Sequence, residues 1–326
     1  MTVYNADFVS HLLPDLVAAC DAAAVQNVRS GHGGPFGASL SVYNRDSGAL
    51  VPVAGPVCNA VLETGLAGAH AEDQVLQPAA LHALRDALQT VGRGCAIVVL
   101  ASSGESCPAC YSKIEIVART LVTDGLIEAG AFVLAYGASY EDTRVVAGFN
   151  DEPYHADMAG PLQNRMIPCV RGDGALPVPA RVVMPDGAAY DGADGRMAQG
   201  TPLFTPEIQA IYTACRAQKK AGVDEPWNLR RAVLYTTAPA VGPLMYAESQ
   251  WANIGRIVQC DGPVALTEAP DATNDALFAV VAARPYNGPG TAVHVVRVTP
   301  FANLAQHEWA RLSEAGQVAH YNGIEA

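Results

Sequence analysis

His70-Ala71-Glu72 and, further along the chain, Cys107-Pro108-Ala109-Cys110 are the two stretches that decide the fold class. The segment between them is long enough for a helix and a strand. One imidazole and two thiolates supply three ligands of a tetrahedral zinc ion, and a catalytic zinc site keeps its fourth position open. Water in such a position becomes a usable hydroxide near neutral pH. The two stretches therefore predict one catalytic zinc ion, held by His70, Cys107 and Cys110.

Glu72 follows His70 by two residues, which is too close in the chain for it to be the fourth ligand. A carboxylate beside an activated water can carry protons between that water and a leaving group. Glu72 is therefore the predicted proton carrier. A Cys-x-x-Cys pair alone is also found in redox pairs and structural zinc sites, so a purely structural metal is the alternative interpretation.

The surrounding elements alternate between strands and helices. We expect helices at 6–29, 70–88 (interrupted at Pro78) and from Cys107 to about 121, and strands at 35–42, 50–57, 95–101 and 131–136. This alternation favours a three-layer α/β domain. His70 and both cysteines then fall in the first turns of helices, where the positive helix end favours a thiolate over a thiol.

Further motifs occur in a fixed order around these two stretches. They are Gly33-Gly34-Pro35-Phe36-Gly37-Ala38, Asn59, Glu105-Ser106 before the first cysteine, Tyr136-Gly137-Ala138-Ser139 and Gly148-Phe149-Asn150-Asp151. Over residues 5 to 170 the chain resembles the guanine deaminase branch of the cytidine deaminase-like superfamily. One departure is Ser106, where that family usually has a proline.

The resemblance implies a three-layer α/β/α cytidine deaminase-like fold and a zinc-dependent aminohydrolase that acts on cyclic amidines in purine metabolism. In such an enzyme, zinc-activated hydroxide attacks the amino-bearing carbon of a free base or nucleoside, Glu72 shuttles the proton, and ammonia leaves. A guanine-like aminopurine is the favoured substrate. Cytosine and aminotriazine-type heterocycles are alternatives, and so is a non-catalytic, zinc-stabilised binding protein.

The resemblance also implies three substrate-binding residues, each with a structural alternative. Asn59 would hydrogen-bond the substrate ring, but asparagine is also a common turn residue. Phe36 would pack against a planar base, but an aromatic residue in a strand more often belongs to the core. Asp151 matches an aspartate near the exocyclic amine of guanine, but it also fits a solvated loop.

Length and composition predict a cytoplasmic enzyme with two domains. The chain has 326 residues, half of them hydrophobic, and no run of apolar residues approaches a membrane span. Met1-Thr2-Val3 and the residues after it lack the build of a signal peptide. The net charge of −12 disfavours a nucleic acid partner. The eight cysteines include one close pair, so we expect the other six to be small buried hydrophobic residues.

The second half repeats the order of elements of the first. We expect a loop-rich stretch at 173–200 with one strand at 180–184, a helix from Thr205, a strand at 230–237, a helix containing Trp251, strands at 256–258 and 292–298, and a final helix at 303–312. Thr205-Pro206-Glu207 resembles His70-Ala71-Glu72 with the histidine replaced.

This order predicts two tandem copies of the fold, with a catalytic domain at 1–172 and a degenerate domain without metal ligands at 173–326. Ala240 and Pro243 would then occupy the thiolate positions, and Glu207 alone would be retained. An unrelated α/β domain is the alternative. A fused copy would form a pseudo-dimer within the chain, and a homodimer is the other possible assembly. Trp227, Trp251 and Trp309 are expected in the core or between the domains.

Overall fold

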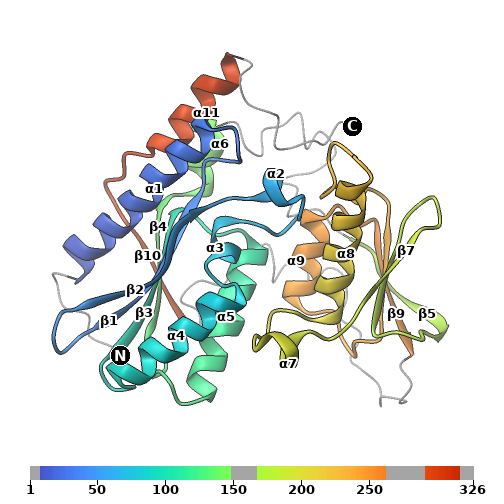
Figure 1. The fold of residues 1–326 in the computed structure, drawn as a ribbon, viewed down its shortest axis with the longest axis horizontal. Coiled ribbons are helices and arrows are strands. Elements are labelled where there is room, and N and C mark those ends of the chain that lie inside the picture. The colour runs from blue at the N-terminus through green and yellow to red at the C-terminus, as the bar shows by residue number, and fades with distance from the viewer. Residues whose placement is uncertain (1–7, 148–166, 262–290, 316–326) are drawn as a thin grey trace.

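The computed structural model describes residues 8–147, 167–261 and 291–315. These residues form two five-stranded mixed sheets, with a double layer of helices between them (Figure 1). The fold is therefore α/β, as the alternating pattern of the sequence predicts.

The first sheet carries helices on both faces. Its strands are β1 (Gly37–Asn44), β2 (Leu50–Cys58), β3 (Ala96–Gly104), β4 (Phe132–Ala138) and β10 (Val293–Arg297), in the order β10-β4-β3-β1-β2. The outer face is covered by η1 (Phe8–Leu12), α1 (Leu13–Arg29), α6 (Tyr140–Ala147) and α11 (Leu304–Glu314), and the inner face by α3 (Ala71–Gln74), α4 (Pro78–Val91) and α5 (Pro108–Thr123). The short helix α2 (Val61–Thr64) lies at the end of β2.

The second sheet packs its helices toward the first half of the chain. Its strands are β5 (Cys169–Ala175), β6 (Ala180–Val183), β7 (Ala189–Gly192), β8 (Val233–Thr236) and β9 (Arg256–Asp261), in the order β5-β9-β8-β6-β7. The helices are α7 (Arg196–Gln199), α8 (Pro206–Lys220) and α9 (Pro243–Trp251). Helices α8 and α9 lie between this sheet and α5 (Figure 1).

The two sheets agree strand by strand in order and direction. β1 pairs antiparallel with β2 and β3, and β6 pairs antiparallel with β7 and β8. β3, β4 and β10 run parallel, and so do β8, β9 and β5. The fifth strands are exchanged along the chain: β5 follows the elements of the first sheet but joins the second, whereas β10 follows those of the second but joins the first.

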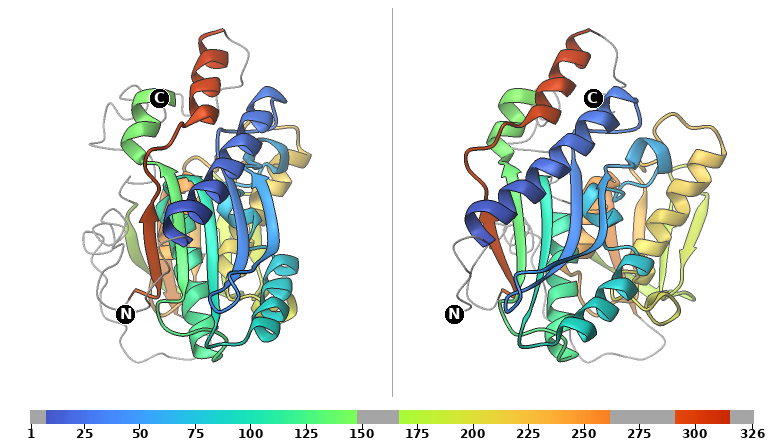
Figure 2. Two further views of the ribbon diagram at one scale, coloured as in Figure 1. Left: turned by 90° about the vertical axis from the view of Figure 1, so that its left-hand side faces the viewer. Right: turned by 60° about the vertical axis from the view of Figure 1, so that its left-hand side comes forward.

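The exchange distributes residues differently from the ranges 1–172 and 173–326. β5 spans the expected boundary and belongs to the second sheet, whereas β10 and α11, from the end of the chain, belong to the first half. Figure 2 shows α11 and α1 side by side on the outer face of the first sheet. Asp21 of α1 ties them together, because its carboxylate accepts hydrogen bonds from the first two amides of α11, Leu304 and Ala305, at 2.7 and 3.0 Å.

Most of the expected elements are present near their predicted bounds. The helix expected at 70–88 is divided into α3 and α4, and Pro78 is the first residue of α4, where its missing N–H costs nothing. β5 and β7 lie in or next to a stretch rich in glycine, proline and aspartate, whose composition predicts loop. Their pairing partners in the second sheet stabilise them as strands.

Phe8–Arg29 is one helical stretch that is long and apolar enough to cross a membrane by length and composition. Its apolar side chains instead cover the first sheet. Leu13 and Val17 are completely buried, in a cluster with Val99 of β3 and Val133 of β4. Core helices of this kind pass the same length and composition test, so the stretch is explained by its packing.

Candidate metal centre

His70 and Cys107 occupy the same position at the start of two neighbouring helices. Each is the residue that precedes its helix, α3 or α5, with extended backbone angles. Cys110 follows in the first turn of α5, and its amide donates to Cys107 Sγ at 3.4 Å. The free amides and the dipole at a helix start favour negative charge. The local sequence therefore places both thiols at the positive end of a helix, as the first turns of the predicted helices suggest.

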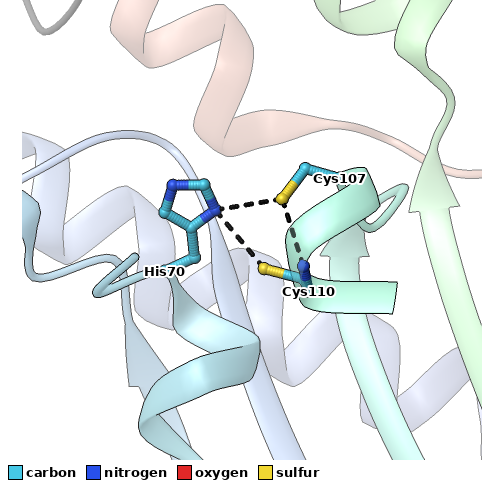
Figure 3. Close-up of side chains that lie close together, drawn as sticks. All are labelled: His70, Cys107 and Cys110. Carbon is cyan, nitrogen blue, oxygen red and sulfur yellow. Dashed lines mark hydrogen bonds between the residues drawn. The ribbon is translucent and has the colours of Figure 1, made fainter. Parts of the chain in front are cut away.

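The three side chains converge in a buried group (Figure 3). His70 Nδ1 lies 3.4 Å from Cys107 Sγ and 3.3 Å from Cys110 Sγ. Zinc–sulfur and zinc–nitrogen bonds of about 2.3 and 2.1 Å at tetrahedral angles place such ligand atoms about 3.6 Å apart. The donor atoms and their spacing fit zinc, and the group could hold a metal ion through Nδ1 and the two sulfurs.

The two thiols differ in their tendency to ionise. Burial opposes ionisation of Cys107, but a hydrogen bond from Cys110 and the nearby charge of His70 hold its pKa well below the usual range. Burial and the negative charge of Cys107 raise the pKa of Cys110 well above its usual range. Cys107 therefore ionises first, and a bound dication would favour ionisation of the second thiol.

Glu72 lies in the first turn of α3 and is held by two hydroxyl groups. Ser102 at the end of β3 and Ser106 before α5 donate to Glu72 Oε1 at 3.2 and 2.9 Å. Burial and the charge of Cys107 raise the pKa of the Glu72 carboxyl, although His70 and the hydrogen bond from Ser106 oppose this. A carboxyl group with a raised pKa is suited to taking and giving protons near neutral pH.

The structure describes two of the three expected substrate-binding residues. Phe36 and Asn59 lie beside the segment that carries His70, because Asn59 donates its amide to the Phe36 carbonyl at 3.0 Å and Ala60 donates to the Ala69 carbonyl at 2.9 Å. Asn59 Oδ1 accepts from the Val61 amide at 3.1 Å, so Asn59 forms a turn before α2. Phe36 is half-buried beside an apolar cluster that includes Trp309. Asp151 lies outside the described residues.

The second half of the chain has the same local framework without the metal ligands. Thr205 precedes α8 as His70 precedes α3, and Glu207 follows as Glu72 does. Glu207 Oε1 accepts from Thr236 Oγ1 at 2.6 Å. Thr236 pairs with Ala180 in the second sheet, and Ser102 pairs with Ala38 in the first, so the two hydroxyl groups hold matching places.

The helix that corresponds to α5 corrects one expectation. α9 begins at Pro243 as α5 begins at Pro108, so Gly242 and Met245 correspond to the two cysteines. Alignment of the second half of the sequence with the first predicts Ala240 and Pro243 at these two positions, which is two residues too early. The loop between β8 and α9 is longer than the loop between β3 and α5, and the sequence alone does not show this difference. Thr205, Gly242 and Met245 offer neither an imidazole nor a thiolate.

Several residues near the site were not identified from the sequence. In the sequence Ser106 stands out only as a replacement for proline, although its hydroxyl group is able to donate a hydrogen bond to a carboxylate. The sequence predicts Trp251 of α9 in the core or between the domains, and its ring packs against the His70 ring in a T-shaped arrangement at a centroid distance of 4.5 Å. Lys113 and Glu248 form a buried ion pair from α5 to α9. No local pattern reveals such long-range contacts.

Comparisons with known proteins leave the family open. No family model matches the chain, and no curated protein matches it. Among solved structures, two mutants of the protein NE0047 in complex with 8-azaguanine are similar to it, at 22% and 24% identity. The matches cover 45% and 44% of this chain and 75% and 77% of those chains, with TM-scores of 0.27 and 0.26. The functional argument therefore rests on the site itself.

Proposed function

We propose that this protein is a zinc-dependent hydrolytic deaminase of a free nucleobase or nucleoside, with a guanine-like aminopurine as the favoured substrate. The observation that carries the proposal is the buried His70, Cys107 and Cys110 group next to Glu72, whose carboxylate is held by two serine hydroxyls. A structural metal site has no use for a buried carboxylate at that place. The resemblance of the motifs to the guanine deaminase branch agrees with this interpretation.

The chain's own residues would divide the chemistry between them. His70, Cys107 and Cys110 would hold zinc, which when bound lowers the pKa of water and supplies the nucleophile. Glu72 would take one proton from the attacking water and give it to the ring nitrogen. It would then carry a second proton, from the newly added hydroxyl group, to the departing amine. A carbon–oxygen bond forms, the carbon–nitrogen bond breaks, and ammonia leaves. Ser102 and Ser106 would orient the carboxylate while it exchanges protons.

Asn59 and Phe36 would bind the substrate ring in this proposal. Both lie next to the segment that ends at His70, and Phe36 also packs against an apolar cluster that includes Trp309. A planar base could stack on the half-buried Phe36 ring. Asp151 would contact the exocyclic amine. A small amino-heterocycle in the cytoplasm, and neither a nucleic acid nor a membrane, is the partner that this site and the net charge of −12 favour.

We further propose that the two halves are tandem copies of one cytidine deaminase-like fold. The shared strand order, the shared pairing directions and the matching Glu207–Thr236 and Glu72–Ser102 hydrogen bonds support this. The second copy then carries no metal and provides within one chain the contact that a second subunit would otherwise make.

The test of the proposed activity is ammonia release by the purified, zinc-loaded protein with guanine, guanosine, adenine, cytosine, cytidine and aminotriazines. We expect turnover of at least one compound and a loss of at least about 100-fold in Glu72→Ala, since general acid–base catalysis contributes about 10²–10⁴-fold. Glu207→Ala is the matched control and should retain turnover. Bound zinc without turnover of any compound would favour the zinc-stabilised binding protein.

A further inference from the structure

The segment that carries His70 has little regular structure of its own. It consists of residues 65–70, named here the His70 loop, and lies between the four-residue helices α2 and α3. Connecting segments are usually more mobile than the elements they join, so contacts with the rest of the protein decide how well the position of this loop is fixed. The second half of the chain contacts the loop at its beginning, middle and end.

The first contact is at Gly65, which has a left-handed backbone with φ of 71°. A Cβ atom at this position would lie 2.7 Å from Pro226 Cγ and 3.0 Å from Lys219 Cδ, so the second half packs directly on the loop backbone. The Lys219 ammonium also donates a hydrogen bond to the carbonyl of Glu63 in α2, two residues before the loop. The beginning of the His70 loop is therefore fixed from α8 and the segment that follows it.

The second contact is at Gly68, where a buried charged group meets the backbone. Lys113 of α5 donates to the Gly68 carbonyl at 3.4 Å and to Asp73 Oδ1 at 2.7 Å, and pairs with Glu248 of α9. Any Cβ at Gly68 would collide with the Glu248 carboxylate and would lie 2.6 Å from the Tyr212 hydroxyl. The side chains of Lys113 and Glu248 are at most 1% exposed. A buried charge that loses its partner is costly, so this contact resists separation of the halves.

The third contact is on His70 itself. The Trp251 ring meets the His70 ring edge to face, at an interplanar angle of 88°. This leaves His70 Nδ1 directed at the two cysteines, and His70 Nε2 is buried without a hydrogen-bond partner among the described residues. The hydrogen bonds and packing that orient a ligating histidine affect how well it binds the metal. Here α9 supplies the packing through Trp251, and Glu248 on the same helix lies against Gly68, two residues before His70.

We propose that α8 and α9 of the second half are a positioning shell for the metal site, in which Glu248 and Trp251 hold the His70 loop and the His70 ring in their ligating geometry. This inference rests on the proposed metal site and assigns a role to the half that carries no ligands. Glu248 and Trp251 act through His70 and contact neither the metal nor the substrate.

The experiment measures zinc affinity by competition with a chromogenic chelator. Glu248→Gln preserves the shape of the side chain and removes its charge, and Trp251→Phe preserves an aromatic ring and reduces its contact with His70. We expect each variant to bind zinc about 10–100-fold more weakly than the wild type, the range found when residues that support metal ligands are changed. Glu207→Gln is the matched control, because it removes another buried carboxylate of the second half, one that accepts a hydrogen bond from Thr236 and, among the described residues, has no hydrogen bond to the His70 loop. Its zinc affinity should be unchanged.

A second readout separates positioning from general stability. Cobalt(II) in place of zinc reports the ligand geometry through its visible absorption bands, and we expect Glu248→Gln and Trp251→Phe to alter these bands while Glu207→Gln retains them. Wild-type affinity and spectrum in both α9 variants would overturn the proposal. So would equal weakening in Glu207→Gln, or a wild type that binds neither metal. Zinc binding without ammonia release would contradict the proposed deaminase but leave this comparison of affinities intact.

Discussion

The two halves of the chain build the same sheet around different residues. In the first half, His70, Cys107 and Cys110 converge within 4.8 Å of one another. In the second, the matching positions hold Thr205, Gly242 and Met245, while Glu207 still accepts a hydrogen bond from the neighbouring strand. The framework that positions a carboxylate is thus shared, and the donors that could hold a cation are not.

This difference teaches that the fold does not need the metal ligands for its own packing. Thr205 fills the place of His70 with a hydroxyl that caps α8, accepting from the Ile208 amide. Met245 fills the place of Cys110 with a buried apolar side chain. Ordinary capping and packing residues satisfy the second framework, so packing alone does not require a histidine and two cysteines at these positions.

Replacing Cys107 by serine should remove the metal. One of three protein ligands is lost, and the binding energy of zinc comes from its ligands, so we expect zinc affinity to fall by at least about 100-fold. Elemental analysis of the dialysed protein is the measurement, with one zinc per chain in the wild type. Met245→Leu, at the matching place in the second half, should retain that zinc. Two zinc ions per wild-type chain would contradict a second half without metal.

Ser106→Ala should reduce turnover of the substrate found in the ammonia assay. The variant removes one of the two hydroxyls on the Glu72 carboxylate, and a hydrogen bond to a charged group is worth about 1.5 kcal/mol, or roughly tenfold in kcat. Zinc content should not change. Thr236→Val removes the matching hydroxyl from Glu207 and should lower stability but not kcat. Equal kcat in Ser106→Ala and the wild type would show that Ser102 alone positions Glu72.

Asp21→Ala should loosen α11, which returns from the end of the chain. Asp21 caps this helix from α1, and loss of a capping side chain costs about 1 kcal/mol. Hydrogen exchange at the Leu304 and Ala305 amides should become faster in the variant. Thr205→Ala removes the local cap of α8 and should lower stability by a similar amount without this change in α11. Unchanged exchange at both amides would show that α11 is held by its apolar contacts alone.

Glu308→Gln should have the smallest effect, and one that depends on pH. Hydrogen bonds from Arg311 and Arg29 lower the pKa of Glu308 from 4.5 to about 2. A carboxylate with a lowered folded-state pKa stabilises the fold above pH 4.5, and this contribution is lost as the pH falls toward 2. The difference in Tm between the wild type and Glu308→Gln should therefore be present at pH 7 and close on acidification. A difference that persists at pH 2 would point to packing and not to charge.

Much of the local structure follows from the sequence because its signals are local. His70, Thr205 and Cys107 precede helices whose first residues are suited to a helix start, and Pro78 divides the helix after His70 as expected. The spacing of His70, Glu72, Cys107 and Cys110 along the chain predicts a metal site with a carboxylate beside it. Helix capping and ligand spacing involve residues a few positions apart, which a linear pattern can display.

The tertiary structure alone decides what joins distant segments. The exchange of β5 and β10 depends on which sheet edge each strand joins, and no periodicity in the sequence describes this. The start of α9, two residues later than the alignment of the two halves predicts, is likewise visible only in the structure. The contact of Trp251 with His70 joins residues far apart in the chain. Short motifs therefore predict which residues form the site, whereas long-range packing decides how they are held in place. The reason is that buried contacts form between whichever surfaces the folded sheets bring together.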